Sequence, residues 1–258
     1  MTSKTHRDFE RKSRLMFAFL VESKLFLEAI WCLYRDCSAN KLYSKTMCYY
    51  VQQSKLTIEI TDFFNKNIDH KENVFVSDFI NGFSYPNLPI ILDNKPEIIT
   101  TSFNWGLLPT HRDKDFRKST LNARVETLSE KPSFAPSINK RCLVIVSAYY
   151  DYHWNDAKGK SKTKYQINSQ DQELFCLAGI YNSWQDNTGT FWNTFSIVTT
   201  EANPQMRYIH NRKEIEGDQR MPILIKHEDE NAWLNAKNHP LDFAYPNYQS
   251  AIIGLPTA

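Results

Sequence analysis

The chain contains few of the residues that define specialised classes of protein. Its 258 residues include only 7 glycines, which follow no fixed repeat, and this excludes collagen-like, low-complexity and repeat architectures. The cysteines form an odd set without C-x-x-C spacing or paired Cys/His motifs, which argues against a disulfide scaffold and against a zinc site. This cysteine usage favours a reducing compartment. The five cysteines are Cys32, Cys37, Cys48, Cys142 and Cys176.

Long apolar runs and an excess of one charge are also missing. The most apolar stretch, 15–34, contains Glu22, Lys24 and Glu28, too many charges for a transmembrane helix. Its short apolar run has no small-x-small cleavage site, which argues against a signal peptide. Residues 1–46 carry 9 Lys/Arg against 5 Asp/Glu, and the rest carries 22 against 24. Any contact with nucleic acid therefore depends on a local groove, because the main body has no positive field.

What is present is a β-rich pattern that begins at Met47. An amphipathic helix is expected at 15–35, and strands are expected at 56–60, 74–76, 88–92, 98–108, 141–152, 164–167, 174–184 and 190–200. Short helices are expected at 124–130, 203–209 and 228–236, and hairpin tips at 155–160 and 186–189.

Strands and helices do not alternate regularly, which excludes a doubly wound sheet and predicts an α+β fold. We expect a single mixed β-rich domain with a partly closed, barrel-like sheet and short helices. The chain divides into a 1–46 extension, a 47–237 domain and a loose 238–258 C-terminal tail. In that tail, Pro240, Pro246 and Pro256 discourage regular structure.

The pair Met47-Cys48 has a chemical meaning only at a chain start. Removal of an initiator methionine before Cys48 would leave an α-amine and a thiol on adjacent carbons, and the two condense with one aldehyde to form a thiazolidine ring. A cysteine inside a chain cannot do this and is typically a packing residue. The pair alone leaves both interpretations open.

Four further segments lie downstream of Cys48 in a fixed order. They are 103–109 (FNWGLLP), 122–127 (NARVET), 141–144 (RCLV) running on to 149–151 (YYD), and 209–212 (IHNR) with 220–224 (RMPIL). In this order they resemble the SOS response-associated peptidase (SRAP) family, the abasic-site-processing proteins that crosslink themselves to DNA. The resemblance covers about 47–225, and its specificity comes from five short motifs in register.

The resemblance implies a set of catalytic residues. Cys48 matches the cysteine that becomes N-terminal and bonds to the ring-opened sugar of an abasic site, and Asn122 matches the residue that holds that sugar. His210 matches the histidine that transfers protons during ring opening and crosslink reversal, although a satisfied helix-end histidine is an alternative. Asp151 stands where the family has glutamate, because 145–152 (IVSAYYDY) replaces Pro-Ala-x-Gly-Phe-Tyr-Glu-Trp. Its shorter carboxylate puts full activity in question, since misplacing a proton-transfer group by about 1 Å costs on the order of a hundredfold in rate.

The resemblance also implies a DNA-binding set. Arg124 matches the arginine that holds the phosphate, and Thr199 falls beside the same site. Trp105 and Arg220 match residues near the DNA path. A guanidinium fork suits phosphate oxygens, and an indole face suits an unstacked base. The residues alone leave alternatives open, since Arg124 and Glu126 could form a solvated ion pair and Trp105 could be a core anchor.

The 47 residues ahead of Cys48 depart most from the family, because they replace the required amine by an amide. Either translation starts at Met47, which we favour because 1–46 matches nothing in the family, or the protein cuts itself between Met47 and Cys48. The 213–219 connection is longer than the family tends to have, which predicts a surface loop.

The leading hypothesis is therefore a DNA-repair enzyme that crosslinks through Cys48 to abasic sites in single-stranded DNA, with self-removal of preceding residues and abasic-site lyase activity. A second hypothesis is a single-strand-binding module whose chemistry is impaired by Asp151, and a third is a general cysteine peptidase. No metal, organic cofactor, membrane contact or obligate protein partner is expected. We expect a cytoplasmic protein that is nucleoid-associated when bound to DNA.

Overall fold

The computed structural model describes residues 49–70, 74, 76–212 and 219–257. Cys48, the helix expected at 15–35 and the rest of the extension lie outside the described residues, as does most of the 213–219 connection. None of the helices in the described ranges is long and apolar enough to cross a membrane.

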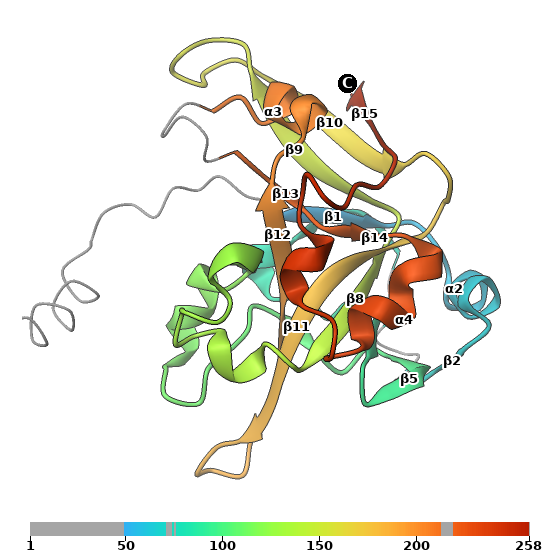
Figure 1. The fold of residues 1–258 in the computed structure, drawn as a ribbon, viewed down its shortest axis with the longest axis vertical. Coiled ribbons are helices and arrows are strands. Elements are labelled where there is room, and N and C mark those ends of the chain that lie inside the picture. Colours follow the sequence, from blue (N-terminus) through green and yellow to red (C-terminus); the bar gives the residue numbers. More distant parts are fainter. Residues whose placement is uncertain (1–48, 71–73, 75, 213–218, 258) are drawn as a thin grey trace, which may run out of the picture. The chain divides into compact units, whose positions relative to one another are not determined.

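The described strands form two sheets (Figure 1). The smaller has the order β15-β10-β9-β1-β3. Its strands are β1 (Tyr50–Gln53), β3 (Ser77–Asn81), β9 (Ala148–Trp154), β10 (Lys162–Ser169) and β15 (Ile252–Thr257).

The larger sheet has the order β13-β12-β11-β8-β4-β5-β2, with β14 paired to β11, and β6 and β7 paired to β12. Its strands are β2 (Asn67–Ile68), β4 (Ile90–Leu92), β5 (Lys95–Thr100), β6 (Asn104–Trp105), β7 (Asn122–Arg124), β8 (Arg141–Val146), β11 (Phe175–Gln185), β12 (Phe191–Glu201), β13 (Arg220–Pro222) and β14 (Leu224–Ile225).

The helices of the described chain are few and short. They are α2 (Thr57–Phe64), α3 (Pro204–Ile209) and α4 (Glu230–Leu234), with 3-10 turns at Gly82–Ser84, Lys114–Ser119, Val125–Thr127, Ala135–Ser137, His227–Asp229 and Pro240–Phe243. The expected mixed, β-rich α+β fold is confirmed. The partly closed, barrel-like sheet is not, because each of the two sheets, as far as it is described, is an open array of strands.

Two hairpins confirm the turn predictions. The pair nearest the turn is Trp154↔Lys162 in the β9–β10 hairpin and Gln185↔Phe191 in the β11–β12 hairpin. At the second tip the carboxylate of Asp186 accepts backbone N–H groups of Thr188 and Thr190 at 2.9 and 3.0 Å. Polar turn residues thus fix the register of both pairs.

The segment expected to be one strand at 141–152 is two strands in different sheets. The chain crosses from β8 to β9 at Ser147, whose N–H donates to Gln52 O at 2.9 Å and whose hydroxyl accepts the N–H of Ser54 at 2.9 Å. A single serine between two apolar stretches is a weak signal for such a crossing. This crossing places Asp151 on the smaller sheet.

The prediction of a strand at 56–60 is wrong, because α2 occupies this segment. The alternation of apolar residues suggested a strand, but only Ile60 and Phe64 are buried, and they are one helical turn apart. Asn65 then ends the helix in the left-handed conformation, with φ 49°. Burial of one helical face outweighed the period-two pattern.

Several other expectations differ in extent. Residues 74 and 76 are not in a strand, 98–108 divides between β5 and β6, and only a 3-10 turn, Val125–Thr127, forms within 124–130. The expected helices at 203–209 and 228–236 are confirmed as α3 and α4.

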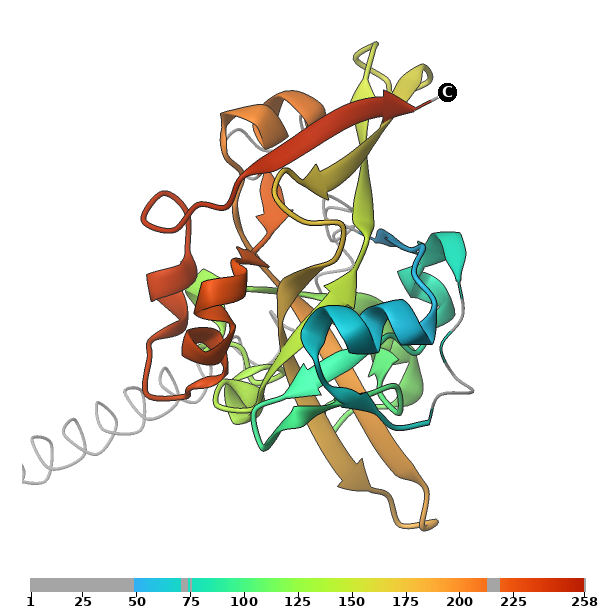
Figure 2. The same ribbon diagram turned by 90° about the vertical axis from the view of Figure 1, so that its right-hand side faces the viewer.

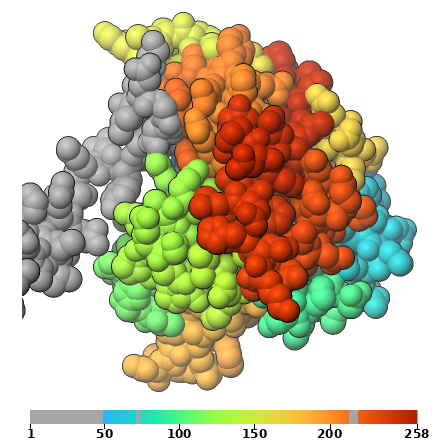
Figure 3. Space-filling model, in the orientation of Figure 1, coloured from blue at the N-terminus to red at the C-terminus, as the bar shows by residue number. Residues whose placement is uncertain are grey.

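The C-terminal segment is not a loose tail. Strand β15 pairs antiparallel with β10 from Lys164↔Thr257 to Ser169↔Ile252, and Figure 2 shows it (red) along the edge of the smaller sheet. Pro256 is tolerated there because an edge strand needs hydrogen bonds on one side only. Figure 3 shows C-terminal residues covering a continuous part of one face of the molecule.

The core lies in two layers on either side of the larger sheet. Strand β8 shows this directly, since Cys142 and Val144 join the layer between the two sheets, whereas Leu143 and Ile145 join the layer under the helices. The first layer also contains Tyr149 of β9, which packs the smaller sheet against the larger one.

Candidate active site

Asp151 and His210 form a buried pair between β9 and the end of α3. His210 Nδ1 lies 2.9 and 2.8 Å from the two carboxylate oxygens of Asp151, and the residues are only 5% and 7% exposed. An ionised carboxylate accepts hydrogen bonds only, and with that form of Asp151 the donor is Nδ1 of His210. The shorter side chain of Asp151 thus reaches the histidine without the extra methylene of glutamate.

Local chemistry holds α3 and its histidine in place. Asn203 caps the helix by accepting the N–H of Met206 at 2.9 Å, and Pro204 occupies its first turn. Met206 and Ile209 are buried, and the Tyr149 hydroxyl donates to Met206 Sδ at 3.5 Å. The N–H of His210 continues the helical ladder to Met206 O at 2.7 Å. The histidine therefore stands at the helix end, facing β9.

The other predicted residues lie on neighbouring strands of the larger sheet. Strand β7 runs parallel to β12, with Asn122 opposite Ile197 and Arg124 opposite Thr199. Asn122 is buried and Arg124 is half-buried, while the buried Thr199 hydroxyl donates to Ala123 O at 3.4 Å. Strand β12 ends at Glu201, and α3 begins three residues later. The strand of Thr199 thus leads directly into the helix that precedes His210.

Cys48 lies outside the described residues, whereas Tyr49 and Tyr50, which follow it, are described. Tyr50 opens β1 and pairs with Tyr150 of β9, the residue before Asp151. Burial, with a smaller effect of Tyr50 and then Asp151, raises the pKa of Tyr152 above its ordinary value, and burial also raises the pKa of Tyr150. Burial thus favours the protonated form of both phenols beside β1.

Trp105 requires a correction. Its side chain is 0% exposed, its indole N–H donates to Leu121 O at 2.7 Å, and its ring lies 6.5 Å from that of Phe195 in a stacked arrangement. Gly82 covers the ring closely, since a Cβ there would come within 3.0 Å of it. No face is accessible to a base, so Trp105 is the core anchor that the sequence left open.

We expect Trp105→Ala to destabilise the fold, because it removes a fully buried indole and leaves a cavity. The free energy of unfolding, measured by urea denaturation, should fall by about 3–5 kcal/mol. A variant with parental stability and selectively lost DNA binding would restore the stacking role.

Arg220 is 6% exposed and already engaged. Its guanidinium holds Glu126 with two hydrogen bonds of 3.0 and 2.6 Å and donates to Thr199 O at 2.8 Å. This fork ties β13 to the segment after Arg124 and to β12. Arg220 thus binds Glu126, and a contact of Arg220 with DNA stays a prediction.

Two further residues, to which the sequence motifs assigned no role, flank His210 along the chain. Tyr208, two residues before His210, is 60% exposed and packs on His153 with ring centroids 4.6 Å apart. Asn211, the next residue after His210, binds the backbone of Trp154. An aromatic residue between the buried positions Met206 and Ile209 was a readable signal for Tyr208, and Asn211 belongs to the 209–212 segment that contributes to the family resemblance.

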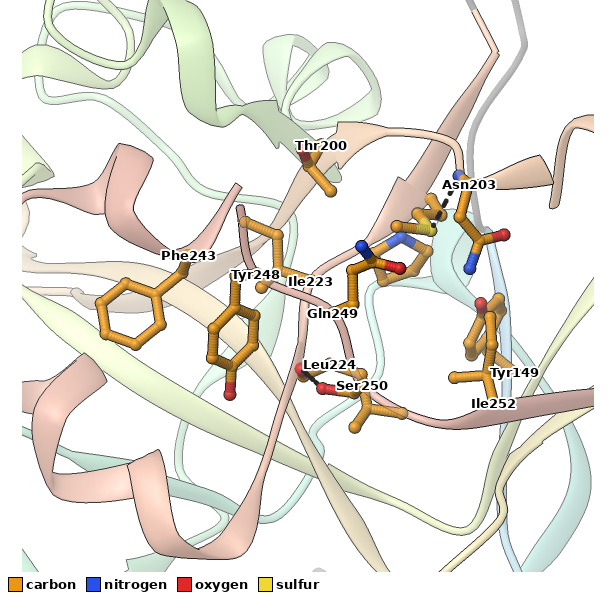
Figure 4. A pocket seen from close by; sticks show the side chains of 12 residues that line it. Tyr149, Thr200, Asn203, Ile223, Leu224, Phe243, Tyr248, Gln249, Ser250 and Ile252 are labelled. Atoms are coloured by element: carbon orange, nitrogen blue, oxygen red, sulfur yellow. Dashed lines mark hydrogen bonds between the residues drawn. The ribbon is translucent and has the colours of Figure 1, made fainter. Parts of the chain in front are cut away.

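A separate pocket does not compete with this site. Figure 4 shows its lining, which includes Tyr149, Thr200, Asn203 and Tyr248 but neither Asp151 nor His210. The lining carries no Asp, Glu, His, Lys or Arg side chain. Within the described residues, no group of three or more His, Cys, Asp or Glu side chains could hold a metal ion.

Two open sheets with a buried carboxylate–histidine pair at the end of a short helix define a mixed α+β protein. The sequence profile of the SOS response associated peptidase (SRAP) family matches residues 47–250, so the chain belongs to this family.

Similar proteins agree with this assignment. The chain is 36% identical over 141 residues to "Abasic site processing protein YoaM" of Bacillus subtilis, over 54% of this chain and 58% of that protein. It is 24% identical over 164 residues to "Abasic site processing protein HMCES" of Xenopus tropicalis, over 52% of this chain and 49% of that protein. The matches thus span about half the length of these relatives. A crystallised protein of Bacteroides thetaiotaomicron has a TM-score of 0.72 and 31% identity, over 82% of this chain and 92% of that one.

Proposed function

We propose that this protein processes abasic sites in single-stranded DNA by forming a covalent adduct through an N-terminal Cys48. The observation that carries the proposal is the buried Asp151–His210 pair beside β1, the strand that begins two residues after Cys48. The names of the relatives, which are abasic site processing proteins, support the same substrate.

The chemistry needs a proton donor and acceptor at one place. The α-amine of Cys48 adds to the aldehyde of the ring-opened sugar, water leaves to give an imine, and the thiol adds to the imine carbon to close a thiazolidine. His210, with its Nδ1–H held by Asp151, exchanges the protons at Nε2. Asn122 and Arg124 are proposed to hold the sugar and its phosphate.

Residues ahead of Cys48 must be absent or removed for this reaction. If they are made, we propose that the Cys48 thiol attacks the carbonyl carbon of Met47. The C–N bond breaks as the amine takes a proton, and water then hydrolyses the thioester. This cleavage would release the free amine that the adduct requires. Abasic-site lyase activity would instead proceed through the imine between that amine and the sugar.

Covalent capture tests the proposal. A protein starting at Cys48, mixed with an abasic single-stranded oligonucleotide, is expected to give a product that survives heating on a denaturing gel, because a thiazolidine has no imine to hydrolyse. Binding without a covalent product after hours would support the alternative, a single-strand-binding module. Capture of an abasic site in a paired duplex at the same rate would contradict single-strand selectivity.

Tyr208 is proposed to stack on a base flanking the abasic site, because it is exposed and close to His210 in sequence. Base–aromatic stacking contributes about 1–3 kcal/mol per base, so Tyr208→Ala should weaken binding of a single-stranded oligonucleotide by roughly tenfold in a fluorescence-anisotropy titration. The matched control is Phe191→Ala. Phe191 is an aromatic residue of similar exposure, at 67%, but it lies at the projecting end of the β11–β12 hairpin (Figure 1). Equal losses in both variants would argue against the role of Tyr208.

A further inference from the structure

Asn211 fastens the segment after α3 to strand β9 at two points. Its Oδ1 accepts the backbone N–H of Trp154 at 2.7 Å, and its Nδ2 donates to the carbonyl oxygen of the same residue at 2.9 Å. Nδ2 also lies 3.3 Å from His153 Nε2. A side-chain amide that binds both backbone groups of one residue acts as a substitute strand partner.

The position of this contact on β9 indicates its structural role. Strand β10 pairs with β9 as far as Trp154, whereas β1 pairs only with Ala148–Tyr150. The end of β9 beyond Tyr150 thus has a strand partner on one edge only among the residues described. The Asn211 amide binds this end, three residues from Asp151.

The contact also restrains the histidine. His210 follows the last turn of α3 with φ −89° and ψ 61°, so it has left the helical conformation. On one side of it, His153 Nδ1 lies 2.7 Å from Tyr208 O, and on the other, Asn211 binds Trp154. His210 is therefore fastened to β9 both before and after its own contact with Asp151.

We propose that Asn211 is a positioning residue that fixes the imidazole of His210 against Asp151 during crosslinking. The inference rests on the proposed function for its kinetic test. Proton transfer is sensitive to displacement, since about 1 Å costs on the order of a hundredfold. We therefore expect Asn211→Ala to slow crosslinking at saturating DNA by about tenfold to a hundredfold, with unchanged affinity for an oligonucleotide carrying a tetrahydrofuran abasic analogue, which has no aldehyde.

Asn155→Ala is the matched control. Asn155 belongs to the same hairpin, but its side chain bonds Ser161 and Thr163 within that hairpin. Its crosslinking rate should equal that of the parent. Asn211→Ser, which keeps a polar group but loses the two-point contact, should slow the reaction like Asn211→Ala and serves if the alanine variant does not fold.

A double variant separates positioning from a merely structural role. In a His210→Ala background, Asn211→Ala should have no further effect on the rate, because the residue it positions is gone. If Asn211→Ala slows the His210→Ala protein by the same factor as the parent, or leaves the parent unaffected, the proposal is wrong.

An NMR measurement keeps the test independent of the reaction. The proton between His210 and Asp151 is expected to give a far-downfield resonance in the parent and in Asn155→Ala that is lost or broadened in Asn211→Ala. An unchanged resonance would overturn the positioning role. Failure of the parent to form any adduct would instead count against the proposed function alone, since the NMR result still decides the role of Asn211.

Discussion

A chain that retains Met47 ahead of Cys48 is expected to form no heat-stable adduct with an abasic oligonucleotide. The nitrogen of an internal cysteine is an amide, whose lone pair is delocalised, so it cannot form the imine that precedes ring closure. Intact mass spectrometry of the crosslinked product should find only species that begin at Cys48. An adduct on a chain that still carries Met47 would exclude the thiazolidine mechanism.

Cys48→Ser in a chain beginning at residue 48 provides the control for the thiol. It keeps the amine and forms a Schiff base, but an oxazolidine is a poorer trap than a thiazolidine. The stable adduct should largely vanish on heating and return when borohydride reduces the imine. A serine variant that matched the parent without reductant would show that the thiol is not needed.

Asp151→Asn is expected to slow crosslinking by about 10²–10⁴-fold. The substitution keeps the size of the side chain, but it removes the negative charge that faces Nδ1 of His210 at 2.8 Å. A histidine without that carboxylate loses both its preferred tautomer and the stabilisation of its protonated form, and general acid–base catalysis typically contributes this much. Single-turnover rates at saturating DNA would measure the loss.

Asp171→Asn is the matched control, because Asp171 is exposed in the turn between β10 and β11, six residues beyond Tyr165, which pairs with Asp151. Its rate should equal that of the parent. An Asp151→Asn protein that also reacted at the parental rate would mean that His210 acts without its carboxylate.

The strongest periodic segments were predictable from sequence. The hairpins β9–β10 and β11–β12 follow from strands bounded by Asn, Asp and Gly, and α3 follows from an Asn-Pro start and buried residues at helical spacing. The α2 helix was missed because three apolar residues alternate at its start, and only burial of Ile60 and Phe64 decided between the two periods.

The sequence by itself determined which chemical groups are available: an aspartate, a histidine and an Asn-Ala-Arg segment in a chain that belongs to the SRAP family. It could not place them, because side chains 59 residues apart meet only through folding. The tertiary structure decided that Ser147 carries the chain into the second sheet, so that Asp151 faces His210. It also buried Trp105, because its large apolar ring packs against Gly82 and Phe195 and its indole N–H finds a buried acceptor in Leu121 O. Local pattern specifies strands and helices, whereas burial and long-range pairing specify which side chains share a site.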